Sequence, residues 1–173
     1  EGLSKSASIF DEAKMRWLNS CYIKDLTSDE FYEKALPFME KVDYLKGYDL
    51  KFLSTLLQNR CETLADVEKL TEFLPAFDGY DTGLFVNAKW KTDREFAKKM
   101  IPDLIALCEK DFGGLHDALV AYAEKAGYKK GQVLWVFRIA ITGAQNTPGG
   151  ATEMAELLGK DKVIARLKES LEK

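Results

Sequence analysis

Apolar residues recur every three or four positions along most of the chain, and no segment alternates convincingly between apolar and polar residues. This period is typical of helices that bury one face. The first such segment predicts a helix from Ser8 to about Ile23. Its apolar face is expected to consist of Ile9, Phe10, Ala13, Trp17 and Leu18. Further helices are predicted from 27, at 49–58, from 63, and at 92–110, 115–126, 132–141, 151–158 and 161–171. The pattern therefore predicts an all-α fold.

Short-range signals indicate where several of these helices begin and end. Thr27 with Glu30 predicts a capping box, and Pro37 is expected to end or kink the helix that follows it. Asp161 is expected to cap the last helix. Glycine favours the left-handed conformation that ends a helix. The glycines expected to end helices in this way are Gly127, Gly143 and Gly159.

The stretch "PAFDGYDTGLFVNAKW", residues 75–90, has the weakest helical pattern. It contains a proline, two glycines and two aspartates, which favour turns. We interpret it as a connector, with a short extended piece, between two consecutive helical subdomains. The predicted subdomains are 1–85 and 86–173.

Composition excludes several classes of protein. Hydrophobic residues make up 46% and charged residues 31%, and no run of about 18 apolar residues could span a membrane. Three widely spaced cysteines fit a reducing cytoplasm, and a single histidine beside them argues against a zinc site. The chain opens "EGLSKSASIF", without methionine or a signal pattern, so we expect it to be part of a longer protein.

The net charge of −3 is unevenly distributed. The segment from Glu124 to Lys173 carries +3, whereas the first 123 residues carry −6. A basic C-terminal part is weak evidence for a polyanionic partner. An ordinary solvated helical surface explains the same distribution equally well.

Sequence motifs for catalysis are absent. The chain has no phosphate-binding glycine loop, no G-x-S-x-G and no H-E-x-x-H. His116, the single histidine, has no partner in the sequence that would indicate catalysis. The residues alone therefore predict an all-α domain without catalytic residues, and RNA binding is one function they allow.

Three stretches resemble the C-terminal anticodon-binding region of bacterial-type glutamyl-tRNA synthetases. They are "IFDEAKMRWLNSCYIKDLTSDEF", "LLQNRCETLADVEKLTEFL" and "KKGQVLWVFRIAITGAQNTPGGATEMAELLGKDKVIARL". The first is similar to the family's F-D-x-x-K-x-x-W-x-N-x-x-Y-I and the second to its L-x-x-x-R-x-x-T-L. The third is similar to K-x-G-x-x-x-x-x-x-R-x-A-x-T-G, followed by a loop and E-L-L-G-K. Their order and spacing hold over nearly the whole chain.

The resemblance implies two helical anticodon-binding subdomains of a class I synthetase. In that family a separate catalytic domain attaches glutamate to its tRNA, using ATP and Mg²⁺. Neither of that domain's ATP-handling signatures occurs in this sequence, so no catalytic residue and no cofactor of its own is expected here. The implied partners are glutamate-specific tRNA and the missing catalytic domain of the same polypeptide, in a cytoplasmic monomer that binds neither DNA nor membrane.

Two arginines match base-reading positions of the family. Arg60 matches the arginine that approaches the third anticodon base, a cytosine, and Arg138 matches the one that faces the first base. A guanidinium group can donate to the acceptors of an unpaired base. The alternatives are that Arg60 closes a turn by binding carbonyl groups, and that Arg138 is a surface arginine or pairs with a glutamate.

A loop and several lysines complete the predicted interface. Thr147, Pro148, Gly149 and Gly150 match the loop beneath the first two bases. As an alternative or additional role, Thr147 would cap the next helix with Pro148 as its first residue. The lysines proposed on charge alone to contact phosphates are Lys91, Lys129 and Lys130.

Three further residues of the first motif have expected roles. For Trp17 we favour core packing over base stacking, and Asn19 and Tyr22 are expected to form hydrogen bonds between helices. The rival function is a free-standing helical module, on the same scaffold, for protein interaction or regulation.

Overall fold

The computed structural model describes residues 11–75, 77 and 79–173, and this part of the chain is helical, as the sequence predicts. Its α-helices are α1 (Glu12–Asp25), α2 (Ser28–Met39), α3 (Leu50–Leu57), α4 (Asp66–Thr71), α5 (Arg94–Lys110), α6 (Leu115–Ala126), α7 (Lys130–Thr142), α8 (Ala151–Leu158) and α9 (Lys160–Glu172). Two short 3₁₀ helices are η1 (Asp43–Leu45) and η2 (Thr82–Phe85). The described residues contain no strand beyond an isolated antiparallel bridge between Asn87 and Thr92.

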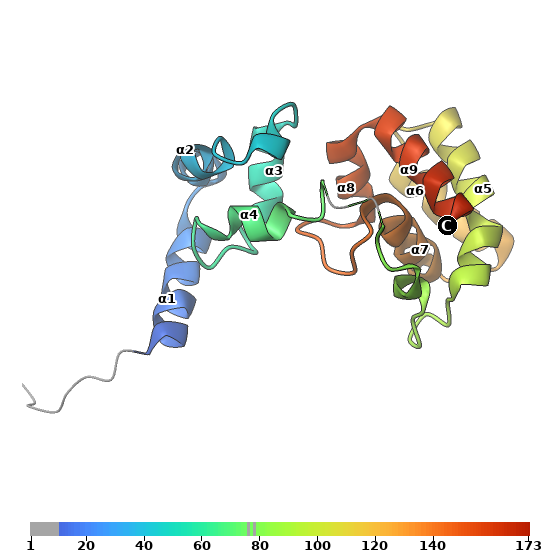
Figure 1. The fold of residues 1–173 in the computed structure, drawn as a ribbon, viewed down its shortest axis with the longest axis horizontal. Coiled ribbons are helices and arrows are strands. Elements are labelled where there is room, and N and C mark those ends of the chain that lie inside the picture. The colour runs from blue at the N-terminus through green and yellow to red at the C-terminus, as the bar shows by residue number, and fades with distance from the viewer. Residues whose placement is uncertain (1–10, 76, 78) are drawn as a thin grey trace, which may run out of the picture.

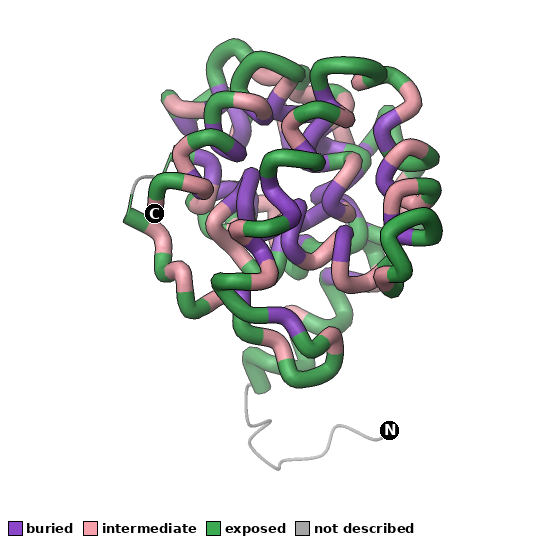
Figure 2. The backbone as a smooth tube through the Cα atoms, turned by 90° about the vertical axis from the view of Figure 1, so that its right-hand side faces the viewer, coloured by how far each residue is buried: buried purple, intermediate pink, exposed green. Residues whose placement is uncertain are grey.

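The helices form two groups that lie side by side (Figure 1). In the first group α2 packs against α3 and α4, whereas in the second α5 packs against α6, α7 and α9. Buried backbone gathers in the interior of the second group, with exposed segments around it (Figure 2). The 3₁₀ helix η2 packs on α5 and α7, so the residues just before 86 contact the second group. The division into subdomains 1–85 and 86–173 stays a prediction.

Hydrogen bonds from polar side chains hold the connecting segment against the second group. The guanidinium of Arg166, buried on α9, donates to the carbonyl oxygens of Ile141 at 2.8 Å and Leu74 at 2.6 Å. It also lies 4.4 Å from the centre of the Phe77 ring. Two carbonyl groups that no helix satisfies are thereby paired, as buried polar groups require.

The local signals for helix ends are mostly confirmed. Thr27 and Glu30 form the predicted capping box at the start of α2. Gly127 and Gly143 adopt the left-handed conformation after α6 and α7. Pro37 does not end its helix, because α2 continues to Met39 with the proline in its last turn.

One predicted helix start and one predicted helix cap are wrong. The helix after α3 begins at Asp66 and not at 63, because the Asp66 carboxylate accepts the backbone N–H groups of Glu62 and Thr63 and holds a turn there. Asp161 does not cap α9. Gly159, at φ +80°, ends α8 and is also the residue before α9, so Asp161 falls inside the first helical turn.

The first helix differs most from expectation. It begins at Glu12, after Asp11 as its cap, and Ser8, Ile9 and Phe10 lie outside the described residues. The described residues of the predicted apolar face are exposed, with Trp17 at 63% and Leu18 at 40% of their full exposure. The prediction that Trp17 packs in the core is therefore wrong. Periodicity reveals an apolar face, but it cannot show whether residues of the same chain cover it.

Candidate nucleic-acid interface

A cleft of about 720 Å³ lies between the two groups of helices and contains the six residues predicted to meet an anticodon. Its walls come from the end of α3, from α4, from α7 and from the loop before α8. The lining residues are Arg60, Lys69, Leu70, Glu72, Phe73, Arg138, Ala144, Asn146, Thr147, Pro148, Gly149, Gly150 and Glu153. Arg60 and Arg138, 78 positions apart in sequence, thus share one concave surface.

Arg60 lies in the turn after α3, and its side chain is exposed. Its Nε donates to the carbonyl oxygen of Pro148 at 3.4 Å, across the cleft. Arg60 therefore does bind a carbonyl group, as the alternative interpretation expects. This carbonyl belongs to the opposite wall of the cleft, however, and not to the turn that contains Arg60. Its two Nη groups have no partner among the described residues, which leaves their donors available to a ligand.

Arg138 lies on α7 between two buried residues, Phe137 and Ile139. One Nη donates to the Gln145 carbonyl at 3.3 Å, whereas Nε is buried and has no partner in the described part of the chain. Burial lowers the pKa of Arg138, and the nearby charge of Arg60 lowers it further. A buried donor without an acceptor is unfavourable by about 1–3 kcal/mol, so the unpaired Nε of Arg138 lowers the stability of the free protein.

The loop between α7 and α8 folds back on itself through its own polar groups. The Thr147 hydroxyl is buried and donates to the Gly149 carbonyl at 2.7 Å. The predictions that Thr147 caps α8 and that Pro148 opens it are wrong, because α8 begins at Ala151. The Glu153 carboxylate accepts the Gly150 N–H at 2.6 Å and satisfies that helix end instead.

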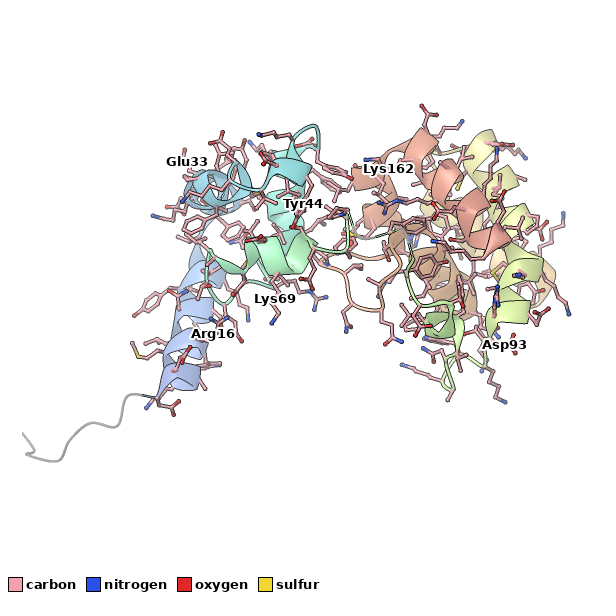
Figure 3. The ribbon with its side chains drawn as sticks, viewed as in Figure 1. Arg16, Glu33, Tyr44, Lys69, Asp93 and Lys162 are labelled. Carbon is pink, nitrogen blue, oxygen red and sulfur yellow. The ribbon has the colours of Figure 1, made fainter. Side chains whose placement is uncertain are left out.

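Several cleft residues were not predicted from the sequence. Lys69 and Phe73 enter from α4 and the turn after it, and Asn146 and Glu153 enter from the opposite wall. Lys69 projects below α4 in Figure 3. No local sequence signal identifies these residues, because the packing of the two groups of helices determines which side of α4 faces the cleft.

The three predicted phosphate-binding lysines do not line the cleft. Lys91 is exposed in the turn between the bridge partners Asn87 and Thr92. Lys129 and Lys130 lie at the start of α7. Lys130 Nζ is 3.2 Å from Nε2 of His116, which lines a smaller hollow that shares Glu153 with the cleft. The structure therefore places none of these three lysines on the walls of the cleft.

The cleft combines three cations with apolar surface. Lys69 joins the two arginines, and the acidic residues Glu72 and Glu153 leave a small positive excess. The half-buried side chains of Leu70 and Phe73 supply apolar faces, and the loop supplies backbone polar groups. Such a mixture is typical of surfaces that bind unstacked bases, which need stacking partners, hydrogen bonds to base edges and charge for phosphates.

The part of the chain that the structure describes contains no candidate metal site and no candidate membrane span. Within it, no group of three or more His, Cys, Asp or Glu side chains could hold a metal ion. None of its helices has the length and apolar character needed to cross a bilayer.

Comparison with known proteins places the chain in a family. The anticodon binding domain family matches residues 30–171. The glutamate–tRNA ligase of Lachnoclostridium phytofermentans is 37% identical over 175 residues, and that of Clostridium botulinum strain Eklund 17B is 40% identical over 178 residues. These matches cover 99% and 98% of this chain but only 36% of each ligase. The chain thus spans about a third of the length of these relatives.

Solved structures share the fold. The glutamate–tRNA synthetase of Elizabethkingia anophelis superposes with a TM-score of 0.75 at 21% identity, over 99% of this chain and 34% of that chain. A glutamate–tRNA ligase of Elizabethkingia meningosepticum, in complex with its amino acid, gives 0.78 at 18% identity, over 98% and 34%. Since the family match extends over most of the sequence and the fold agrees, the chain belongs to the anticodon binding domain family.

Proposed function

We propose that this chain binds the anticodon loop of a glutamate tRNA and distinguishes that loop from others, as one part of a glutamate–tRNA ligase. The observation that carries the proposal is the single cleft in which Arg60, Arg138 and the 147–150 loop meet. Membership of the anticodon binding domain family and the names of the relatives support the same assignment.

In this proposal the anticodon bases are unstacked and enter the cleft separately. The Nη groups of Arg60 donate to the O2 and N3 acceptors of the third base, a cytosine, and Arg138 meets the first base. The 147–150 loop presents backbone groups to the first and second bases, Phe73 provides a stacking surface, and Lys69 attracts phosphate.

Attachment of glutamate is assigned to the part of the ligase that lies outside this chain. ATP and Mg²⁺ are assigned to that other part as well, because the ATP-handling signatures of the family do not occur in this sequence. The chain's own residues bind and discriminate. We also propose that the complete ligase is a cytoplasmic monomer.

Salt should weaken the complex. If about three phosphates are neutralised by lysine and arginine, raising the salt concentration from 50 to 200 mM is expected to weaken binding about 20-fold. The measurement is titration of this chain with a fluorophore-labelled RNA that contains the anticodon stem and loop. Affinity that does not change with salt would contradict a charge-based RNA interface.

Replacing Arg60 with glutamine should mainly reduce discrimination. We expect the preference for cytosine over uracil at the third anticodon position to fall about 10-fold, because the charged fork of donors is lost. Thermal unfolding should hardly change, since Arg60 is exposed. The preference is measured as the ratio of Kd values for two stem–loops that differ in that base. An unchanged ratio would contradict the role of Arg60.

The rival function, protein interaction, draws on a different surface. Met15, Trp17, Leu18 and Tyr22 expose apolar area on α1. Large exposed apolar side chains gathered on one helix often mark a contact with another protein surface. Replacing Trp17 with serine shows whether this surface is separate from the RNA interface, because the change should leave RNA affinity intact if RNA binds in the cleft. Loss of RNA binding in that variant would move the interface to α1.

A further inference from the structure

The turn that carries Arg60 is held in place by residues of α1 and α4. On its N-terminal side, the N–H groups of Arg60 and Cys61 both donate to the Leu57 carbonyl, at 2.8 and 3.0 Å. Cys61 is buried. The backbone of Arg60 is therefore anchored directly to the end of α3.

On the C-terminal side of Arg60, the Asp66 carboxylate closes the turn. Its Oδ2 accepts the N–H groups of Glu62 at 2.9 Å and Thr63 at 2.8 Å, and its Oδ1 accepts from Arg16 Nη2 at 2.9 Å. Partial burial alone would raise the pKa of Asp66, but these hydrogen bonds outweigh it and the pKa lies below its usual value. The carboxylate is thus ionised at neutral pH, and both of its oxygens accept hydrogen bonds.

Helix α1 reaches the same turn with two side chains. The guanidinium of Arg16 spans two carboxylates, with Nε at 2.7 Å from Glu62 Oε2 and Nη2 on Asp66. Asn19 Nδ2 donates to the Glu62 carbonyl oxygen. Figure 3 shows Arg16 on the side of α1 that faces α4. Glu62, two residues after Arg60, is therefore fixed through its N–H, its carbonyl and its side chain.

None of Arg16, Asn19 and Asp66 lines the cleft, so they cannot contact a base there. Their effect on a ligand must pass through the position of Arg60. A long side chain amplifies small backbone shifts, and a recognition group displaced by about 1 Å loses its hydrogen-bond geometry.

We propose that Arg16, Asn19 and Asp66 are positioning residues that fix Arg60 and thereby set discrimination at the third anticodon base. This inference rests on the proposed function. It explains why α1, which lies outside the cleft, presents a polar edge toward the α3–α4 turn. These three residues would then affect binding at one anticodon base, in addition to stabilising the fold.

The test compares Arg16→Met, Arg16→Lys and Asn19→Ala with the unchanged chain. For each, Kd is measured for the glutamate anticodon stem–loop and for two variant RNAs, one altered at the third base and one at the first. Arg16→Met and Asn19→Ala are expected to reduce discrimination at the third base about 5-fold while leaving discrimination at the first base unchanged, because Arg138 is held by α7. Arg16→Lys, which keeps one charged donor, should restore part of the loss.

Lys51→Met is the matched control. Lys51 forms an exposed ion pair with Asp29 at 2.9 Å in the same group of helices, away from the Arg60 turn. Removing the charge of Lys51 should change discrimination at neither the third nor the first base. Asn19→Ala removes a single hydrogen bond and preserves charge, so it remains informative if Arg16→Met does not fold.

The outcomes separate the two claims. If the unchanged chain does not bind the stem–loop, the proposed function fails, and this inference fails with it. If the unchanged chain discriminates at both bases and the variants lose both preferences equally, or lose neither, only the positioning role is overturned. A loss confined to the third base supports it, since general destabilisation of the fold would affect both bases.

Discussion

Arg138→Met is expected to weaken binding of the glutamate anticodon stem–loop about 100-fold while leaving the protein as stable as before, or slightly more stable. The loss of binding follows from removal of charged donors in a partly desolvated site, where such interactions are strongest. The unchanged or increased stability follows from removal of a buried Nε that has no acceptor within the described residues. Methionine keeps an unbranched side chain of similar length to the aliphatic stem of arginine.

Isothermal titration with the stem–loop and urea denaturation of the free chain measure the two effects. Arg94→Met is the matched control, because Arg94 is exposed at the start of α5 and does not line the cleft. That change should reduce affinity by at most a few-fold through net charge. If Arg138→Met destabilises the fold and binds RNA normally, the arginine is structural and its assignment to the first base is wrong.

Gly143→Ala is expected to lower the free energy of unfolding by about 3 kcal/mol. Gly143 has φ +64°, which a side chain disfavours by about 1–2 kcal/mol. A methyl group would also lie 2.7 Å from Cβ of Tyr80, so the connecting segment would have to shift. Since Gly143 begins the loop that lines the cleft, RNA affinity should fall as well.

Gly127→Ala separates the two causes of that loss. Gly127 has a similar φ of +72°, but nothing lies within 4 Å of the position of an added methyl group. Its substitution should therefore cost only about 1 kcal/mol, the conformational part. Urea denaturation of both variants gives the comparison. Equal losses would show that Tyr80 yields freely and that backbone conformation alone makes glycine necessary at 143.

The sequence predicts helix ends well where the responsible residues lie within one turn of each other. The capping box of Thr27 and Glu30 and the left-handed residues Gly127 and Gly143 are confirmed because these contacts are local. Thr147 was assigned the wrong partner, since its hydroxyl binds within the loop and Glu153 occupies the helix end. Two local arrangements were possible there, and the choice depends on packing.

The candidate site was predictable only through resemblance. Composition and periodicity did not single out Arg60 or Arg138, whereas the motifs did, and the structure brings both into one cleft. Lys69 and Phe73 could not be found in this way, because their orientation depends on contacts between helices far apart in sequence. Trp17 shows the same limit, since an apolar periodicity does not reveal what covers it.

Arg60 and Pro148, which are in contact, lie 88 positions apart in the sequence, and this separation determines when the molecule becomes able to bind RNA. Closing so long a loop costs conformational entropy that the packing of α5 to α9 has to offset. The wall that carries Arg60 is synthesised before the wall that carries Pro148. Affinity for RNA is therefore a property of the finished molecule alone, and moderate heating that loosens either group should abolish it before the helices melt.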